Sequence, residues 1–274
     1  MSDIIHCLVC NKVQFTLIDG YRRCEKCRTY IAESLPNERR VQKVLEEHAS
    51  SFIVGSQESK DIRTEEMRLS LIKKFSKVAS IVIDFGCGKG KFVEFLSSKK
   101  YKVFGYDKSE VIKKYLVSKN IAFYESVKEI PTGYFDVATC FDVIEHVTNP
   151  RHLIWTIVRK LKKDGIFIIS TPNSIGFSAR ILGKRWWVFS ARSHFILFSP
   201  YSLKLLLADM GFEILDAKTD TITPWFTPSE RFVFKIFNKL IYLIFLPFKS
   251  ILFDNYLGDN IQIVAKLAGS KNAG

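Results

Sequence analysis

The sequence lacks the features that mark an exported or membrane-spanning protein. Residues 1–7 have neither the basic region nor the long apolar core of a signal peptide. The longest uncharged apolar run, residues 240–248, is far shorter than the roughly 20 residues that a spanning helix requires. We therefore expect a cytoplasmic protein, in which paired cysteines bind metal more often than they form disulfides.

Acidic residues are too few to balance the basic ones. The 274 residues include 41 Lys and Arg but 28 Asp and Glu, which gives a formal charge of +13. This charge favours an anionic partner such as RNA, phospholipid headgroups or a phosphorylated substrate. The basic residues are scattered in pairs, as at Lys73-Lys74 and Lys162-Lys163, so charge alone does not choose among these partners.

Cysteine is also scarce, and four of the six residues form two Cys-x-x-Cys pairs near the N-terminus. They are Cys7, Cys10, Cys24 and Cys27. Two such pairs can place four thiolates tetrahedrally around zinc on a small β-ribbon. Residues 13–23 alternate like a hairpin with its turn at Asp19-Gly20, and so small a module needs metal binding for its folding energy. We expect structural zinc here without a catalytic role; a redox or iron centre is the alternative.

Glycine is concentrated in one turn, which follows the apolar run 81–83 and Asp84 and precedes a helix that begins near Lys91. Its glycines are Gly86, Gly88 and Gly90. The pattern predicts a strand, a tight turn and a helix, and glycine lets the backbone approach a ligand closely. Lys91 occupies the place of the third glycine in a dinucleotide-binding motif, and Asp84 would repel a diphosphate but suit a cationic group.

A second predicted strand, residues 102–106, ends in Asp107. This carboxylate comes about twenty residues after the glycine turn, where it can accept both ribose hydroxyls of a nucleoside. Together with Asp84, it indicates a nucleoside with a positive or neutral tail. These residues resemble the class I S-adenosylmethionine-dependent methyltransferases. The alternative is a doubly wound domain with an empty crevice.

The segments that follow extend this resemblance. Predicted strands at 121–124, 134–140 and 166–170, the last two separated by a helix at 151–161, are typical of a parallel sheet. Three motifs are similar to those of quinone-biosynthesis O-methyltransferases and of methyltransferases with sugar or lipid-linked substrates. They are Phe135-Asp136-Val137, Asp142-Val143-Ile144-Glu145-His146-Val147 and Ile169-Ser170-Thr171-Pro172-Asn173.

The resemblance covers about residues 80–215 and resumes at 258–266. It implies an α/β fold with a doubly wound, mostly parallel, seven-stranded sheet. A small four-cysteine zinc ribbon precedes the sheet, and an apolar helical insert precedes its last strand. We expect three parts: the ribbon at 1–34, connecting helices at 35–78, the first of them at 38–48, and a methyltransferase domain at 79–274.

The resemblance also implies the site residues. Those expected to bind the cofactor are Asp84, Gly86, Cys87, Gly88, Gly90, Asp107, Ser126, Val127, Phe141 and Asp142. The candidate catalytic residues are His194, His146 and Asp142, with Glu145 and Asn173 at the same edge of the sheet. His194 lies in an aromatic segment, 186–195, that we expect to form a lid, where it is either a base or a packing residue. A divalent metal at Asp142, Glu145 and His146 is a further expectation, and the alternative is that Glu145 and His146 cap and pack the turn.

Residues 222–257 depart from the pattern of a soluble protein. Within them 232–253 are almost all apolar, with lysines near one helical stripe and an interruption at Pro247. This composition favours a helical hairpin that lies in a membrane interface, and packing against the sheet or another subunit is the alternative. A membrane-facing insert favours a lipid-linked acceptor and a peripheral position on the inner face of a membrane.

The leading hypothesis is methyl transfer from S-adenosylmethionine to a small or lipid-linked acceptor, at an oxygen. The zinc ribbon and the charge of +13 favour an RNA methyltransferase as the alternative. Against RNA, the fourth predicted strand ends in Cys140-Phe141-Asp142 and lacks the Asn/Asp-Pro-Pro-aromatic tetrapeptide of amino-methylating enzymes. A third hypothesis is a non-catalytic adaptor that uses the ribbon and the apolar insert as binding surfaces.

Overall fold

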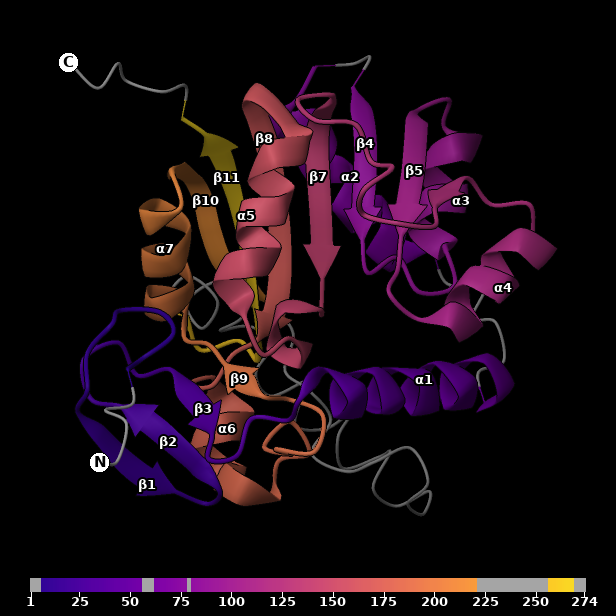
Figure 1. Ribbon diagram of the computed structural model, residues 1–274. Coiled ribbons are helices and arrows are strands. Elements are labelled where there is room, and N and C mark those ends of the chain that lie inside the picture. The colour runs from indigo at the N-terminus through magenta and orange to yellow at the C-terminus, as the bar shows by residue number, and fades with distance from the viewer. Residues whose placement is uncertain (1–5, 56–61, 78–79, 221–255, 269–274) are drawn as a thin grey trace.

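A computed structural model describes residues 6–55, 62–77, 80–220 and 256–268 (Figure 1). These residues form a seven-stranded sheet in the order β10-β11-β8-β7-β4-β5-β6 and a four-stranded sheet in the order β1-β2-β3-β9. The strands of the larger sheet are β4 (Ile81–Phe85), β5 (Lys102–Tyr106), β6 (Phe123–Tyr124), β7 (Phe135–Phe141), β8 (Leu161–Pro172), β10 (Phe212–Asp220) and β11 (Asn260–Leu267).

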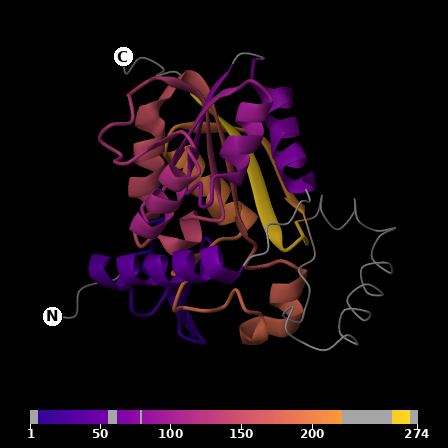
Figure 2. The same ribbon diagram turned by 90° about the vertical axis from the view of Figure 1, so that its right-hand side faces the viewer.

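The larger sheet has the doubly wound architecture that the sequence predicts. Strands β4, β5, β6, β7 and β8 are mutually parallel, and β11 is antiparallel to both β8 and β10. Helices pack on both faces (Figure 2). They are α2 (Arg63–Phe75), α3 (Lys91–Ser98) and α4 (Glu110–Ser118) on one face, and α5 (Pro150–Lys160) and α7 (Pro200–Asp209) on the other.

Alternation of apolar side chains along the strands explains the two layers. In β8, Phe167 and Ile169 belong to the core under α5 and α7, whereas Ile166 and Ile168 belong to the core under α2, α3 and α4. Since side chains in a strand point to opposite faces in turn, a run that is apolar throughout must be covered on both sides. The seven-stranded fold is therefore confirmed.

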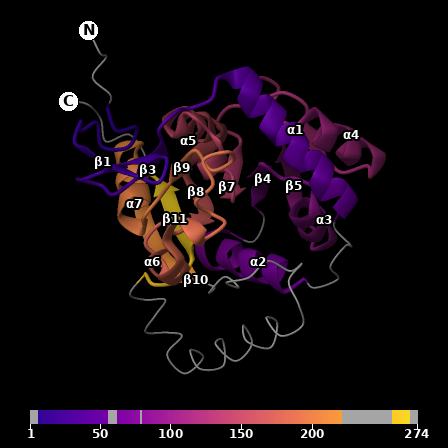
Figure 3. The same cartoon turned by 90° about the horizontal axis from the view of Figure 1, so that it is seen from below.

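Several predicted boundaries need correction. The predicted strand at 121–124 is reduced to β6 (Phe123–Tyr124), and β8 begins at Leu161, before the predicted 166. The predicted connecting helix extends much further, as α1 (Glu38–Gly55). Helix α1 crosses below the carboxyl ends of β4 and β5, where it closes that edge of the sheet (Figures 1 and 3).

The four-stranded sheet joins the N-terminal cysteine ribbon to a short strand much later in the chain. The strands β1 (Phe15–Ile18), β2 (Tyr21–Cys24) and β3 (Tyr30–Ala32) form the predicted ribbon, with a turn at Asp19-Gly20. Its fourth strand is β9 (Ile196–Leu197), which pairs antiparallel with β3. The ribbon therefore shares a sheet with a segment that the sequence places in the methyltransferase domain, and the division at residue 34 stays a prediction.

The predicted apolar insert lies almost wholly outside the described residues, since 221–255 are not among them. Its proposed membrane contact stays a prediction. Among the residues that the structure does describe, no helix is both long and apolar enough to span a bilayer.

Candidate functional site

A large cavity opens at the carboxyl edge of the larger sheet, where parallel α/β sheets bind their ligands. It lies between the ends of β4, β5, β7 and β8, helix α1 and the segment that carries Trp186 and His194. Its volume is about 1550 Å³. Ligand pockets usually measure about 300–1000 Å³, so this cavity has room for a cofactor and an acceptor side by side.

The glycine turn forms one wall of the cavity. Gly86 has φ +73°, and a Cβ built on it would lie 2.2 Å from Val143 Cγ2. Gly86, Cys87 and Gly88 line the cavity, but Gly90 does not: a Cβ at Gly90 would meet Leu116 and Ile121 at 2.9 Å. Gly90 is therefore required for close packing of α3 against its neighbours. It does not line the cavity in which we expect the cofactor.

Asp107 lies directly below this turn. Its Oδ2 accepts a hydrogen bond from the Gly88 N–H (3.1 Å), and its Oδ1 accepts one from the Ser109 N–H (2.9 Å). Burial raises the pKa of its carboxyl group. An ionised carboxylate can accept about four hydrogen bonds, so two remain for a ligand in the cavity that Asp107 lines. This geometry fits the two hydroxyls of a ribose.

Asp84 is the second buried carboxylate of the cavity. Its Oδ1 accepts a hydrogen bond from Thr139 Oγ1 at 2.6 Å. Burial raises the pKa of Asp84 to about 6, although the Thr139 hydroxyl and the positive charge of Arg68 oppose the rise. A cationic ligand group beside Asp84 would favour its ionised form.

Arg68 is a cavity residue that the sequence did not single out. Its guanidinium carbon lies 4.0 Å from the centroid of the Phe141 ring, and its Nη2 lies 3.9 Å from Asp142 Oδ2. It places a positive charge beside the acidic side chains at this end of the cavity. Its guanidinium can therefore bind a ligand carboxylate. In the sequence it is one of several basic residues on α2, and only the packing distinguishes it.

The remaining predicted cofactor residues differ in placement. Phe141, Asp142 and Val127 line the cavity. Ser126 does not, and its Oγ instead accepts a hydrogen bond from the Lys128 N–H within a turn (3.3 Å). Cys87 lines the cavity with its buried thiol packed close to Gly105.

At the other end of the cavity, Glu145, His146 and His194 come together. One ligand atom of each lies within 4.8 Å of the others. The Nδ1 of His146 lies 2.7 Å from the Ser193 carbonyl oxygen, and the Nδ1 of His194 lies 2.7 Å from the Val188 carbonyl oxygen. Because a carbonyl only accepts, each Nδ1 carries the proton, and each Nε2 is the atom free to accept or to coordinate.

Burial keeps this cluster uncharged. It lowers the pKa of His194 to about 4 and lowers that of His146 below its usual value. Burial also raises the pKa of Glu145, and the charge of Asp142 adds to the rise. Glu145 Oε2 accepts a hydrogen bond from Thr171 Oγ1 at 2.8 Å. Two neutral imidazoles therefore face the cavity at neutral pH.

The predicted divalent-metal set needs one change. Asp142, with φ +57°, lies outside the cluster, and its Oδ1 accepts a hydrogen bond from Ser170 Oγ (3.2 Å). His194 takes its place, although it is 49 residues from Glu145 in the chain. Asn173 is structural instead, since its Nδ2 donates to the carbonyls of Tyr256 (2.9 Å) and Gly258 (2.7 Å).

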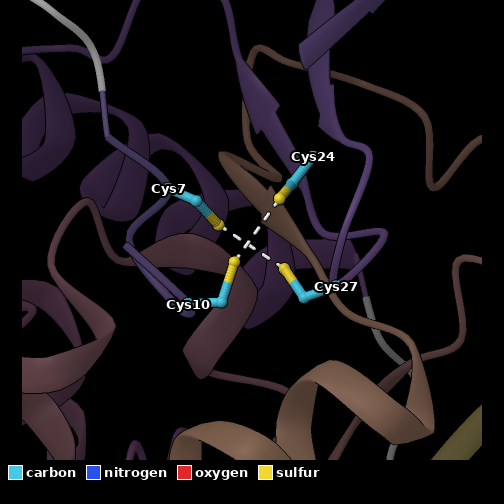
Figure 4. A group of neighbouring side chains, drawn as sticks. All are labelled: Cys7, Cys10, Cys24 and Cys27. Atoms are coloured by element: carbon cyan, nitrogen blue, oxygen red, sulfur yellow. Dashed lines mark hydrogen bonds between the residues drawn. The ribbon is translucent and has the colours of Figure 1, made fainter. Parts of the chain in front are cut away.

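The four N-terminal cysteines converge as predicted (Figure 4). The sulfurs of Cys7 and Cys27 lie 3.5 Å apart, as do those of Cys10 and Cys24, and all four lie within 4.8 Å of one another. A tetrahedron with Zn–S bonds of about 2.3 Å has edges of about 3.8 Å, so these thiols fit a zinc ion. His6 is exposed, with its Nδ1 3.3 Å from the Asn11 carbonyl oxygen, and is not part of the set.

Comparison with known proteins identifies the family to which the chain belongs. The family model described as a methyltransferase domain matches residues 56–217, more than half of the chain. The ubiquinone biosynthesis O-methyltransferase of Rickettsia canadensis is 26% identical over 173 residues, which are 57% of this chain and 73% of that protein. The protein of the same name from Dechloromonas aromatica is 34% identical over 103 residues, 34% of this chain and 44% of its own, so the chain spans less than half of that relative.

A solved structure shares the fold. The 1,6-didemethyltoxoflavin-N1-methyltransferase of Burkholderia thailandensis, with bound 1,6-didemethyltoxoflavin and S-adenosylhomocysteine, has a TM-score of 0.54 at 16% identity. The match covers 88% of this chain and 96% of that one. At this identity the likeness concerns the fold alone.

Proposed function

The chain belongs to the methyltransferase domain family and is an S-adenosylmethionine-dependent methyltransferase, and from this premise we propose that it methylates an oxygen of a small or lipid-linked acceptor held beside His194. One observation carries the proposal. The cavity joins a nucleoside-binding turn at one end to two neutral imidazoles at the other.

The cofactor end of the cavity supplies groups for each part of S-adenosylmethionine. Asp107 would accept hydrogen bonds from the ribose hydroxyls, and the turn at Gly86 and Gly88 would let the nucleoside approach the backbone. Asp84 would face the ammonium and Arg68 the carboxylate of the methionine moiety, since Asp84 is a buried acidic group and Arg68 a partly buried cation of this wall. Residues so placed would hold the sulfonium between this wall and the acceptor end of the cavity.

The acceptor end supports attack by a hydroxyl. A sulfonium methyl group is already activated, so the protein mainly has to hold the acceptor oxygen in line with it. A neutral Nε2 of His194 or His146 can take the hydroxyl proton as the oxygen attacks. The same two nitrogens and the Glu145 carboxylate also form a set that suits a divalent metal, which would lower the pKa of a bound hydroxyl.

A lipid-linked acceptor is supported by where the apolar insert meets the fold. Asp220 pairs with Asn260, and Asn260 pairs with Pro172 at the end of β8. The insert therefore leaves and rejoins the sheet at the carboxyl edge, and Asp259 and Asn260 line the cavity. An apolar sequence between these two attachment points, together with a charge of +13, favours a peripheral position on an anionic membrane surface.

Methylation of RNA is the second candidate, favoured by the cysteine ribbon and the positive charge. Incubation of the protein with labelled cofactor and a cell extract, followed by separation of lipid, RNA and aqueous fractions, distinguishes the candidates. We expect label in the lipid or aqueous fraction. Label found only in RNA would contradict the proposal, and no label in any fraction would favour the adaptor hypothesis. The variant Asp107→Asn is the negative control.

A further inference from the structure

The segment that carries His194 has little regular structure of its own. Between η2 (Gly183–Arg185) and β9 it forms only turns, such as those that join Phe189 to Trp186 and His194 to Ser190. We call residues 186–197 the His194 segment. Turns of this kind do not fix a side chain within a cavity, so its position depends on what packs around it.

The ribbon supplies the contacts on one side. The Tyr21 hydroxyl donates a buried hydrogen bond to the carbonyl oxygen of His194 itself, at 2.8 Å. The Ala32 N–H donates to the next carbonyl, that of Phe195, at 2.8 Å. Strand β3 then continues the pairing to β9. The ribbon therefore holds the backbone from His194 to Leu197, directly beside the His194 imidazole.

A small core seals this junction. It contains buried residues of the ribbon and of the His194 segment, together with α6 (Phe177–Leu182): Tyr21, Ala32, Ala179, Trp186, Val188 and Leu197. The ring of Phe189 packs edge-on against both tyrosines of the ribbon, with centroids 6.0 Å from Tyr21 and 5.3 Å from Tyr30. This core is separate from the two that cover the larger sheet.

The ribbon in turn depends on its cysteines. Its strands have four, four and three residues, too few to bury a core alone, so metal binding by the four thiols would add to the folding energy that its packing against the larger domain supplies. Its knuckles also contact the larger domain. Arg151 on α5 donates to the carbonyls of Leu8 (3.1 Å) and Val9 (2.7 Å), within the Cys7–Cys10 pair.

We propose that the ribbon is a zinc-dependent clamp that orders the His194 segment, with Tyr21 as the positioning residue for the His194 backbone. The zinc ion bound by the four thiolates would hold the ribbon in shape. The ribbon, through Tyr21, Ala32 and strand β3, would hold His194 at the acceptor end of the cavity. The importance of this ordering for catalysis rests on the proposed function, whereas the ordering itself does not.

A pair of matched variants tests the clamp by hydrogen exchange of the full-length protein with zinc bound and without an acceptor. Tyr21→Phe keeps the ring and removes the hydroxyl that bonds to His194. We expect exchange in peptides spanning 190–197 to become about fivefold faster, the factor for one lost buried hydrogen bond. Tyr30→Phe is the control, because the Tyr30 hydroxyl donates no hydrogen bond to the described residues. Equal exchange in both variants would overturn the role of Tyr21.

Removal of zinc from the wild-type protein by a chelator gives the second measurement. We expect the His194 segment to lose protection by at least about tenfold while β4, β5 and β7 keep theirs, and calorimetry to show cofactor affinity unchanged within about twofold. Re-addition of zinc should restore the protection. Zinc release that leaves the His194 segment fully protected would overturn the clamp. A failure to find any methylated acceptor would contradict the proposed function and leave this result standing.

Discussion

The absence of a side chain at Gly86 is required for both the fold of the glycine turn and the shape of the cavity. We expect Gly86→Ala to destabilise the protein by roughly 2–4 kcal/mol and to abolish cofactor binding, because strain at positive φ adds to the clash with Val143. Gly133→Ala is the matched control, since Gly133 has φ +60° but open space around it. It should cost about 1–2 kcal/mol and leave binding intact. Equal losses in both variants would contradict a steric role for Gly86.

Asp107 gives a prediction about cofactor affinity. Asp107→Asn retains one carbonyl oxygen but loses charge and acceptor capacity toward the ribose. We expect cofactor affinity, measured by calorimetry, to fall about tenfold to a hundredfold. Asp164→Asn removes an exposed carboxylate 3.1 Å from Lys266 and should leave affinity unchanged. A similar affinity in both variants would mean that Asp107 does not bind the ribose.

Asp84 gives a prediction about pH. Its pKa is raised from 3.8 to about 6 in the folded state, so the folded protein binds this proton more tightly than the unfolded one. The stability from that proton is complete below pH 3.8 and is lost as the pH rises through about 6. Between pH 4 and 7, Asp84→Asn should therefore lose less unfolding free energy than the wild type, by up to about 3 kcal/mol. Urea denaturation of the cofactor-free protein at both pH values measures the difference, and parallel curves would contradict the burial argument.

At the scale of elements, the Glu46 carboxylate joins α1 to the start of α4. Glu46 accepts hydrogen bonds from the N–H groups of Glu110 (2.9 Å) and Val111 (3.2 Å) at the start of α4, and from Ser109 Oγ (2.6 Å). Glu46→Ala should lower the unfolding free energy by about 1–2 kcal/mol, as the loss of a helix cap does. Glu47→Ala removes an exposed i,i+4 pair with Lys43 and should cost less than about 0.5 kcal/mol in the same denaturation experiment. Equal costs would show that Glu46 does not join the two helices.

The sequence predicts local elements well and distant contacts poorly. Strand β5 has its predicted bounds, and Ser109, a residue type that favours this position, caps α4, because both depend on residues close in the chain. Asp142 was expected to share a metal site with Glu145 and His146. It has positive φ and lies before the turn at Ile144–His146, because its N–H donates to the Ser170 carbonyl and so continues the pairing of β7 with β8.

Contacts between segments far apart in the chain leave no periodic pattern in the sequence, so they could not be predicted from it. The pairing of β3 with β9 joins the ribbon to a strand far along the chain. The approach of His194 to Glu145 joins a distant loop to the segment that follows β7. Arg68 enters the cavity by packing against Phe141, and this contact too leaves no local signal. The cysteine spacing was the exception, because tetrahedral metal ligation links pair spacing directly to geometry.

At the scale of the whole molecule, the charge of +13 gives a prediction about surfaces. We expect the protein to sediment with vesicles that contain an anionic lipid at low salt, and binding to weaken as ionic strength rises toward about 0.5 M because salt screens the attraction. Vesicles of zwitterionic lipid alone are the control. Equal binding to both kinds would exclude an electrostatic contribution.

The shared four-stranded sheet also limits how this protein can be trimmed. The family match, 56–217, includes His194 but neither Tyr21 nor β11. A fragment cut to that match would expose the bare edges of β8 and β9 and the apolar side chains that β11 buries, and unpaired edges of this kind promote aggregation. For soluble expression, the ribbon and the C-terminal strand therefore have to be kept with the segment that matches the family.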